Sequence, residues 1–185
     1  MNTTSSQRMT QGERAVYDRL SILLHWFIFV CVVALCVIGF LFYKLDFNSD
    51  SYNTYYYWHR SIGELVFVVV LVSVVWRFKR PAPPPLDDVP WRTRVAKLTQ
   101  RVLIVLLVAV PAIKIWRGAY GIGWAFFSWS IPAPLPKNVA MGHFLTDAHY
   151  YAAISLIALS VLHSLAALWH HYCLKDKLIN RMNPF

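Results

Sequence analysis

The sequence is poor in cysteine and carries no sign of a cleaved leader. Its 185 residues include only three cysteines, Cys31, Cys36 and Cys173, and no CxxC motif. A disulfide framework is therefore not expected, and the three thiols should be free. Residues 1–19 are polar and lack the short apolar core and cleavage site of a secretory signal, so we expect nothing to be removed. No internal repeat is visible, which favours a single domain.

Acidic residues are also scarce, with nine Asp and Glu against 18 Lys and Arg, for a formal net charge of +9. The basic residues flank apolar stretches and form no separate domain, which argues against a nucleic-acid partner. Thirteen of the 18 lie before residue 20, in 77–101 or after residue 171. The positive-inside rule then places both termini and the middle loop in the cytoplasm.

Apolar residues dominate what is present, at 57% of the chain with 16% aromatic. Four stretches are long enough to cross a hydrocarbon core, near 20–43, 59–78, 97–116 and 147–171. Pro111 interrupts the third. The sequence thus predicts an all-α, four-helix transmembrane bundle over 20–171, between a cytoplasmic N-terminal tail (1–19) and a cytoplasmic C-terminal tail (172–185).

Two connecting segments have a distinctive composition. The Pro-rich segment 81–90 predicts a stiff spacer between the second and third helices. Beyond it, Arg92, Arg94 and Lys97 either contact lipid phosphates or guard a site for an anionic or quinone-like ligand. The aromatic segment 119–135 is too short to span, and it predicts a surface-lying element that serves as an interfacial anchor, a lid over the outer end, or both.

Four histidines lie in or at the mouth of the apolar stretches: His25, His59, His149 and His163. An ionisable side chain at membrane depth is costly, so it usually marks a functional site with a partner. The last two are 14 residues apart on one helix. They therefore share a face and are separated by about 21 Å along the axis. Neutral imidazole is a common axial ligand of haem iron, and this separation suits two stacked cofactors.

The depth of each histidine along its helix predicts how they pair. His25 and His163 fall toward the inner side, whereas His59 and His149 fall toward the outer side. Each pair suits one bis-histidine haem, and the third helix completes the four-helix wall. Hydrogen bonding between helices is the alternative for a single histidine, but two depth-matched pairs favour ligation. A zinc or copper site would need clustered ligands, so one compact metal centre is excluded.

Three further histidines are assigned by position. His143 lies six residues before His149. It is a surface residue or a competing outer ligand, and we favour His149 because His143 lies about 9 Å further out. His170 is seven residues past His163 and near the same face. It either hydrogen-bonds a quinone carbonyl or a propionate, or lies with His171 beside lipid headgroups.

Several segments together resemble the bacterial cytochrome b561 family of four-helix dihaem membrane cytochromes. The matching segments are SILLHWFIFV, YYWHRSIG, WRFKRPAPP, GIGWAFFSWSIP and AHYYAAISLIALSVLHSLAALWHHYCLKDKLINRM, which cover nearly the whole chain after residue 15. The most specific is the fourth-helix pattern, His-x13-His followed by an Ala-rich turn, HHY and KD.

The resemblance implies two haem b groups per chain with axial ligands at His25, His59, His149 and His163. It also implies a superoxide:quinone oxidoreductase of the superoxide oxidase type. In that type superoxide reduces the outer haem, and ubiquinone is reduced at the inner side, where the position matching His170 lines the quinone site.

The chain departs from relatives at two places. Lys97 and Gln100 stand in a lead-in where relatives tend to carry histidine, which bears on the inner site. Lys114, followed by Arg117, replaces the usual small residue beyond Pro111, which bears on the outer end and its donor.

Basic residues predicted on the outer side are candidates for steering an anion such as superoxide: Lys114, Arg117, Arg60 and Lys137. They are equally candidates for haem propionate partners, Arg60 foremost, or for ordinary interfacial solvation. On the inner side, His170 with Lys97 or Arg101 is a candidate for proton uptake during quinone reduction.

Three functions compete on this sequence. The first is a stand-alone redox enzyme that moves electrons from superoxide to quinone. The second is an electron-carrier or anchor subunit for a hydrogenase, a formate dehydrogenase or a periplasmic cytochrome. The third is a cofactor-free structural protein or small transporter. Short loops and the lack of an added domain favour the first.

Overall fold

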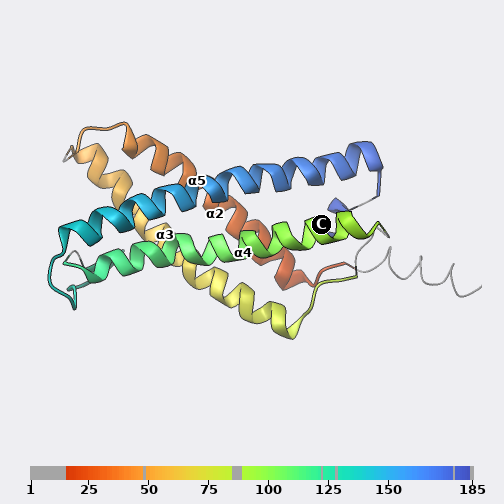
Figure 1. Cartoon of the computed structure of the whole chain (residues 1–185), viewed down its shortest axis with the longest axis horizontal. Coiled ribbons are helices and arrows are strands. Elements are labelled where there is room, and N and C mark those ends of the chain that lie inside the picture. The colour runs from red at the N-terminus through yellow and green to blue at the C-terminus, as the bar shows by residue number, and fades with distance from the viewer. Residues whose placement is uncertain are drawn as a thin grey trace, which may run out of the picture.

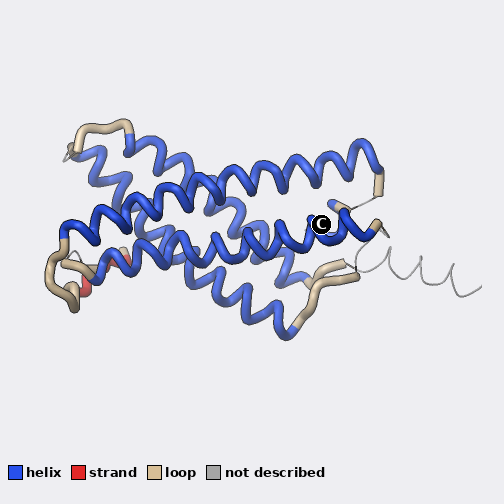
Figure 2. Tube along the Cα trace, viewed as in Figure 1, coloured by secondary structure: helices blue, strands red, loops and turns tan. Residues whose placement is uncertain are grey.

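The computed structural model describes residues 16–47, 49–84, 89–121, 123–127, 129–176 and 178–183. Long helices make up most of this part of the chain, as Figures 1 and 2 show. In chain order the elements are α2 (Arg19–Tyr43), α3 (Asp50–Lys79), α4 (Pro90–Ala119), β1 (Trp124–Phe126), β2 (Trp129–Ile131), α5 (Val139–Trp169), the π-helix η1 (His170–Leu174) and the 3₁₀-helix η2 (Ile179–Met182).

All four long helices are long and apolar enough to cross a membrane, which confirms the predicted fold class. Three of them begin well before the apolar stretches expected from the sequence, because polar residues continue them. In two of these the first turn is stabilised by a side-chain cap: Ser49 accepts a hydrogen bond from the Tyr52 amide, and Asn138 accepts one from Met141. The third, α4, begins with Pro90 in its first turn.

Pro111 does not end the third helix, which runs on to Ala119. The aromatic segment that follows differs from the expectation of a simple surface-lying element. It forms a small antiparallel hairpin, in which Trp124 pairs with Ile131 and Phe126 with Trp129. Gly118 makes this possible: a Cβ there would lie 2.7 Å from the Trp124 ring, whose Nε1 donates to the Ile115 carbonyl at 2.7 Å.

The bundle consists of two helical hairpins. Helix α2 packs on α3 and α4 packs on α5, while α3 also contacts α4. Figure 1 shows the two hairpins crossing, with the β1–β2 hairpin at one end and both ends of the described chain at the other. These ends are called here the hairpin end and the termini end. A small core of Ile28, Val66 and Val70 holds α2 against α3, with Leu107 and Val108 of α4 packed on it.

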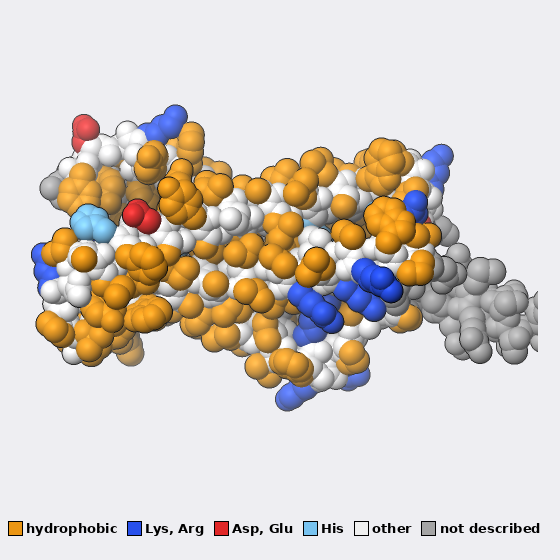
Figure 3. All heavy atoms as spheres, in the orientation of Figure 1, with side chains coloured by type: hydrophobic (Ala, Val, Ile, Leu, Met, Phe, Trp, Pro, Cys, Tyr) orange, Lys and Arg blue, Asp and Glu red, His pale blue; other side chains and the backbone are white. Residues whose placement is uncertain are grey.

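The outer surface of the bundle suits lipid. Large apolar side chains remain exposed on every long helix: Val37 is 55% exposed, Val68 55%, Val105 63% and Leu162 60%. In Figure 3 hydrophobic side chains cover the middle of the visible face, and basic side chains gather toward its ends. Because these exposed residues cannot be covered within one chain, the surrounding hydrocarbon is their natural environment.

The termini end is closed by contacts between distant segments. The Tyr17 amide donates to the Arg181 carbonyl at 3.2 Å. The buried Arg181 guanidinium donates to the Pro84 carbonyl at 2.6 Å, and Trp26 donates to the Met182 carbonyl at 2.7 Å. The C-terminal segment predicted as a tail therefore folds back under α2. The rest of the predicted N-terminal tail (1–15) and residues 85–88 of the Pro-rich segment lie outside the described residues.

Asp18 caps α2 and links it to α3. Its carboxylate accepts hydrogen bonds from the Ser21 amide and hydroxyl and from Trp76 Nε1 at 2.9 Å. The Ser21 hydroxyl is the main cause that lowers the pKa of the Asp18 carboxyl, against an opposing effect of desolvation.

Replacing Asp18 with alanine is expected to lower the free energy of unfolding by about 1 kcal/mol, the typical value of a helix cap. Since the folded-state pKa is the lower one, this stabilisation is present above the unfolded value of about 4 and is lost as pH falls through the folded value. Thermal unfolding of the detergent-solubilised protein, followed by circular dichroism at pH 7 and pH 3, measures both effects. The exposed Asp147→Ala is the control, and equal losses in the two variants would contradict the cap.

Candidate haem-binding site

Two of the predicted ligands face each other at the hairpin end of the bundle. The ring centroids of His59 on α3 and His149 on α5 are 6.3 Å apart, with an interplanar angle of 80°. Two metal–imidazole bonds of about 2 Å on opposite sides of one ion would place the ring centroids about 6 Å apart. The observed separation is that of two imidazoles sharing one metal ion.

Backbone carbonyls orient both rings. His59 Nδ1 donates to the Leu35 carbonyl of α2 at 3.1 Å, and His149 Nδ1 donates to the Val110 carbonyl of α4 at 2.9 Å. Each histidine is thus held by the helix that packs beside its own. Because Nδ1 carries the proton in these bonds, Nε2 of each ring is left with its lone pair, which is the state a metal ligand requires.

Gly39 on α2 leaves the space that the His59 ring occupies. A Cβ at this position would lie 3.1 Å from His59 Cε1 and 3.3 Å from Nδ1. Such contacts are tighter than ordinary van der Waals packing, so any side chain here would push on the ring. Gly63 on α3 has no neighbouring atom within 4 Å of a Cβ built at that position, so packing does not require a glycine there.

The other two predicted ligands lie together toward the termini end. His163 on α5 and Arg77 on α3 both act electrostatically on His25 of α2. Helix α5 is continuous from Val139 to Trp169, so His149 and His163 share its face about 21 Å apart. The structure therefore brings His59 and His149 into ring contact, and the pairing of His25 with His163 stays a prediction.

The helices that carry each pair stand apart from one another. Among the described elements, α5 packs closely against α4, and neither α2 nor α3 approaches its backbone to the same degree. The facing imidazoles thus bridge helices that are not in close backbone contact. A flat ligand held between two imidazoles needs this separation. No group of three or more His, Cys, Asp or Glu side chains lies together within the described part of the chain.

Lys114 lies beside the His59–His149 pair. It is the residue one helical turn past Val110, on the same face of α4. Helical side chains lean toward the N-terminus, which directs Lys114 back over that turn. Its charge acts on both His59 and His149. Within the described residues its ammonium makes no hydrogen bond or ion pair with an acidic side chain, so a half-buried cation lies next to the pair.

Two other basic candidates are engaged in holding the fold. Arg117 donates to Thr146 Oγ1 at 2.7 Å and to the Gly142 carbonyl at 3.2 Å, which ties α4 to α5. Arg60 donates to the Gly123 carbonyl at 2.9 Å and pairs with Glu64 at 3.4 Å, which ties α3 to the β1 strand region. Lys137, the fourth candidate, is exposed.

The remaining three histidines differ in their exposure and in their hydrogen-bond partners. His170 begins the π-helix η1, and its Nδ1 donates to the Asp176 carboxylate. His143 and His171 are exposed. Lys97 and Arg101 of α4, the two basic residues predicted to act with His170, are both exposed.

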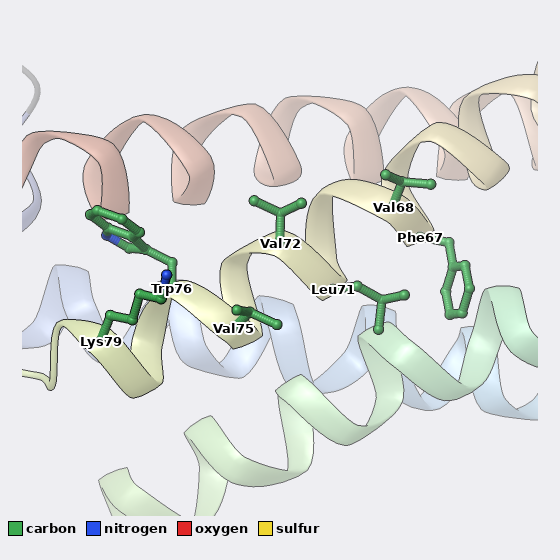
Figure 4. Close-up of a pocket in the computed structure, with 7 residues that line it drawn as sticks. All are labelled: Phe67, Val68, Leu71, Val72, Val75, Trp76 and Lys79. Carbon is green, nitrogen blue, oxygen red and sulfur yellow. The ribbon is translucent and has the colours of Figure 1, made fainter.

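A surface groove on α3 is a separate feature. It has a volume of about 380 Å³ and is lined entirely by α3 residues, namely Phe67, Val68, Leu71, Val72, Val75, Trp76 and Lys79. Figure 4 shows these side chains along one stretch of α3, with apolar groups over most of its length. It contains none of the paired histidines, and its apolar lining suits an acyl chain rather than redox chemistry.

A four-helix membrane bundle with facing imidazoles, each held through Nδ1, defines a membrane protein built to ligate haem iron. Comparison with known proteins agrees. Residues 16–184 match the family model described as prokaryotic cytochrome b561.

Characterised relatives match over most of their lengths. The chain is 30% identical to cytochrome b561 homolog 2 of Escherichia coli K12, with 90% of each chain covered. It is 27% identical to the probable superoxide oxidase CybB of Yersinia pestis, with 91% of this chain and 96% of the relative covered. It is 28% identical to cytochrome b562 of Cereibacter sphaeroides, with 90% and 94% covered. The chain belongs to the prokaryotic cytochrome b561 family, whose members are membrane haem proteins of electron transport.

The family implies haem b, and the residues fit that group. The imidazole pair has the spacing of a bis-histidine iron site, its Nδ1 atoms are held, and a glycine stands where a Cβ would crowd one ligand. The sequence predicted these two histidines as ligands but did not predict their supports, the Leu35 and Val110 carbonyls and Gly39. A backbone acceptor has no sequence signal, and a single glycine in an apolar helix predicts nothing about the ring that packs on it.

Proposed function

We propose that this chain binds two haem b groups and passes electrons across the bacterial inner membrane, from superoxide at the outer side to ubiquinone at the inner side. The observation that carries the proposal is the facing of His59 and His149 with both Nδ1 atoms held. The similarity to a relative named probable superoxide oxidase supports the choice of donor.

The orientation in the membrane follows from charge. The segments at the termini end carry most of the Lys and Arg residues, which places that end in the cytoplasm by the positive-inside rule. The hairpin end, with His59 and His149, then faces the periplasm. The termini end, with His25, His163 and His170, faces the cytoplasm.

When bound, haem supplies one-electron chemistry that protein side chains lack. His59 with His149, and His25 with His163, would hold the two haem groups through their imidazole nitrogens. Lys114 supplies a positive charge next to the outer pair, which attracts an anion and favours its arrival at this end. Two superoxide anions each give up one electron and leave as dioxygen. One quinone takes up those two electrons and two protons to become the quinol.

A second candidate function is an electron-carrier subunit that serves a partner dehydrogenase, hydrogenase or periplasmic cytochrome. The hairpin favours it to a degree, because Trp129 is 77% exposed and Phe126 43% exposed at the end where a partner would dock. The same aromatic side chains suit the membrane interface, so the hairpin does not require a partner.

The test uses the full chain purified in detergent and a superoxide-generating system. We expect two haem b per chain by pyridine haemochrome assay. Superoxide should change the haem absorbance to the reduced form, and a short-tailed ubiquinone should reverse the change. Added superoxide dismutase should abolish the reduction. Two haems without superoxide-driven reduction would instead support the carrier function, and a colourless protein would overturn both.

A charge variant sharpens this test. Replacing Lys114 with glutamine should lower the second-order rate of superoxide-driven reduction about tenfold and weaken its dependence on ionic strength, because a local cation is lost. The control is Lys44→Gln, which removes an exposed lysine from the same end of the bundle. Equal rates for the two variants would remove Lys114 from the proposal.

A further inference from the structure

The termini end of α5 carries a carboxylate–imidazole pair that is separate from the four paired histidines. His170 begins the π-helix η1, a local widening that is often found at functional sites. Lys175 then takes a left-handed conformation, with φ 53°, and turns the chain back. This turn brings the Asp176 carboxylate onto His170 Nδ1. The side chains of His170 and Asp176 are only 23% and 25% exposed, so other parts of the protein cover most of the pair.

Asp176 is itself fixed from a second direction. Its Oδ1 accepts a hydrogen bond from the Leu178 amide at 3.0 Å, and its own amide donates to the His170 carbonyl at 3.4 Å. The Arg181 guanidinium acts on it electrostatically. Arg181 is 6% exposed and is anchored to the Pro84 carbonyl. The carboxylate is thus held in place by the backbone on both sides and by a buried cation.

This arrangement determines the state of the imidazole. With Nδ1 bound to a carboxylate, Nε2 is the ring atom left for other partners. The hydrogen bond to the carboxylate also fixes the orientation of the ring, and so the direction in which Nε2 points. His170 lies seven residues past His163, which is about 10 Å along the helix axis and near the same face. An acceptor bound between the inner histidine pair and η1 would therefore lie beside His170, at the end of the bundle that the proposed orientation places in the cytoplasm.

We propose that Asp176 is a positioning residue that holds His170 as a proton-delivering group for a quinone reduced at this end of the bundle. The inference rests on the proposed function for the quinone and names the source of its protons. Each quinone takes up two electrons from two one-electron steps. In each proton transfer an Nε2–H bond of His170 breaks and an O–H bond of the quinol forms. His170 then recovers its proton from cytoplasmic water, so two cycles complete one quinol.

The test separates proton delivery from the donor side of the reaction. The full-length protein is first reduced with dithionite, the excess is removed, and its reoxidation by a short-tailed ubiquinone is followed by stopped flow. Asp176→Asn should slow reoxidation about tenfold while leaving haem content and superoxide-driven reduction unchanged. Because superoxide is absent from this assay, failure of the superoxide step would not be confused with failure of the pair.

Rescue by a conservative variant distinguishes positioning from a merely structural role. Asp176→Glu keeps a carboxylate that can accept from His170 Nδ1, so it should restore the reoxidation rate in part, whereas Asp176→Asn should not. The control is Asp46→Asn, which removes an exposed carboxylate at the opposite end of the bundle and should reoxidise at the wild-type rate.

A double variant guards against an indirect effect. If Asp176 acts through His170, then His170→Gln with Asp176→Asn should be no slower than His170→Gln alone. Independent, multiplying losses would overturn the proposal. So would a wild-type reoxidation rate in Asp176→Asn with both haems retained.

Discussion

Replacing His149 with alanine is expected to reduce the haem content of the purified chain from two haem b to one. His149 supplies one of the two imidazoles of the outer pair, and its partner His59 alone would leave one axial position without a protein ligand. The inner pair lies about 21 Å away along α5 and should keep its haem. Superoxide-driven reduction should fall at least a hundredfold, because the site nearest the periplasm is lost.

The matched control for this experiment is His143→Ala. His143 lies on the same helix, six residues nearer its start, and is exposed. It was the competing candidate for the outer ligand. Haem content is measured by pyridine haemochrome assay for both variants, with circular dichroism to confirm that each retains its helices. One haem in His143→Ala and two in His149→Ala would reverse the assignment of the outer ligand.

Replacing Gly39 with valine is expected to remove the outer haem without touching either ligand. A Cβ alone would lie 3.1 Å from His59 Cε1, and the branched methyl groups of valine cannot be placed without moving the ring. Moving the ring breaks the 3.1 Å hydrogen bond to the Leu35 carbonyl, which fixes its orientation. Loss of such a support typically costs about 10–100-fold in metal affinity. Gly39→Ala should show a smaller loss, because a shift of a few tenths of an ångström accommodates one methyl group.

Gly63→Val provides the control, since nothing lies within 4 Å of a Cβ at Gly63. Both variants place valine in an apolar membrane helix, so any general effect of β-branching on insertion is shared. The measurement is haem content, supported by the reduced-minus-oxidised spectrum of the remaining haem. Two haem groups per chain in Gly39→Val would show that α2 shifts to accommodate the side chain. The tight contact at Gly39 would then not affect ligation.

The membrane fold was predictable because it depends on composition along the chain. Long apolar runs must form helices in hydrocarbon, where each backbone group has to find its partner within its own segment. The positions of His25, His59, His149 and His163 along those runs were enough to pair them by depth. Helix ends were less predictable. Asp50–Tyr57 and Val139–Thr146 are helical because capping side chains extend α3 and α5 beyond the apolar runs.

The aromatic segment shows a structure that composition alone does not predict. Its tryptophans and phenylalanines correctly indicated the end of the bundle, but they did not indicate a hairpin. The hairpin is held by contacts with other helices: Arg60 donates to the Gly123 carbonyl, and the Phe127 amide donates to Ser61 Oγ at 3.3 Å. Such contacts depend on residues more than 60 positions away, which no local pattern contains.

The sequence by itself determined the four helices and the membrane environment, because both follow from the composition of single segments. It also predicted the two pairs of histidines from their depth along those segments. Only the tertiary structure decided which groups meet. It engages Arg60 and Arg117 in holding the helices, leaves Lys114 beside the outer pair, and joins Asp176 to His170. The physical reason is that periodicity defines which residues share a face of one helix. The rotation of each helix against its neighbours, set by packing of side chains from all four, defines what that face touches.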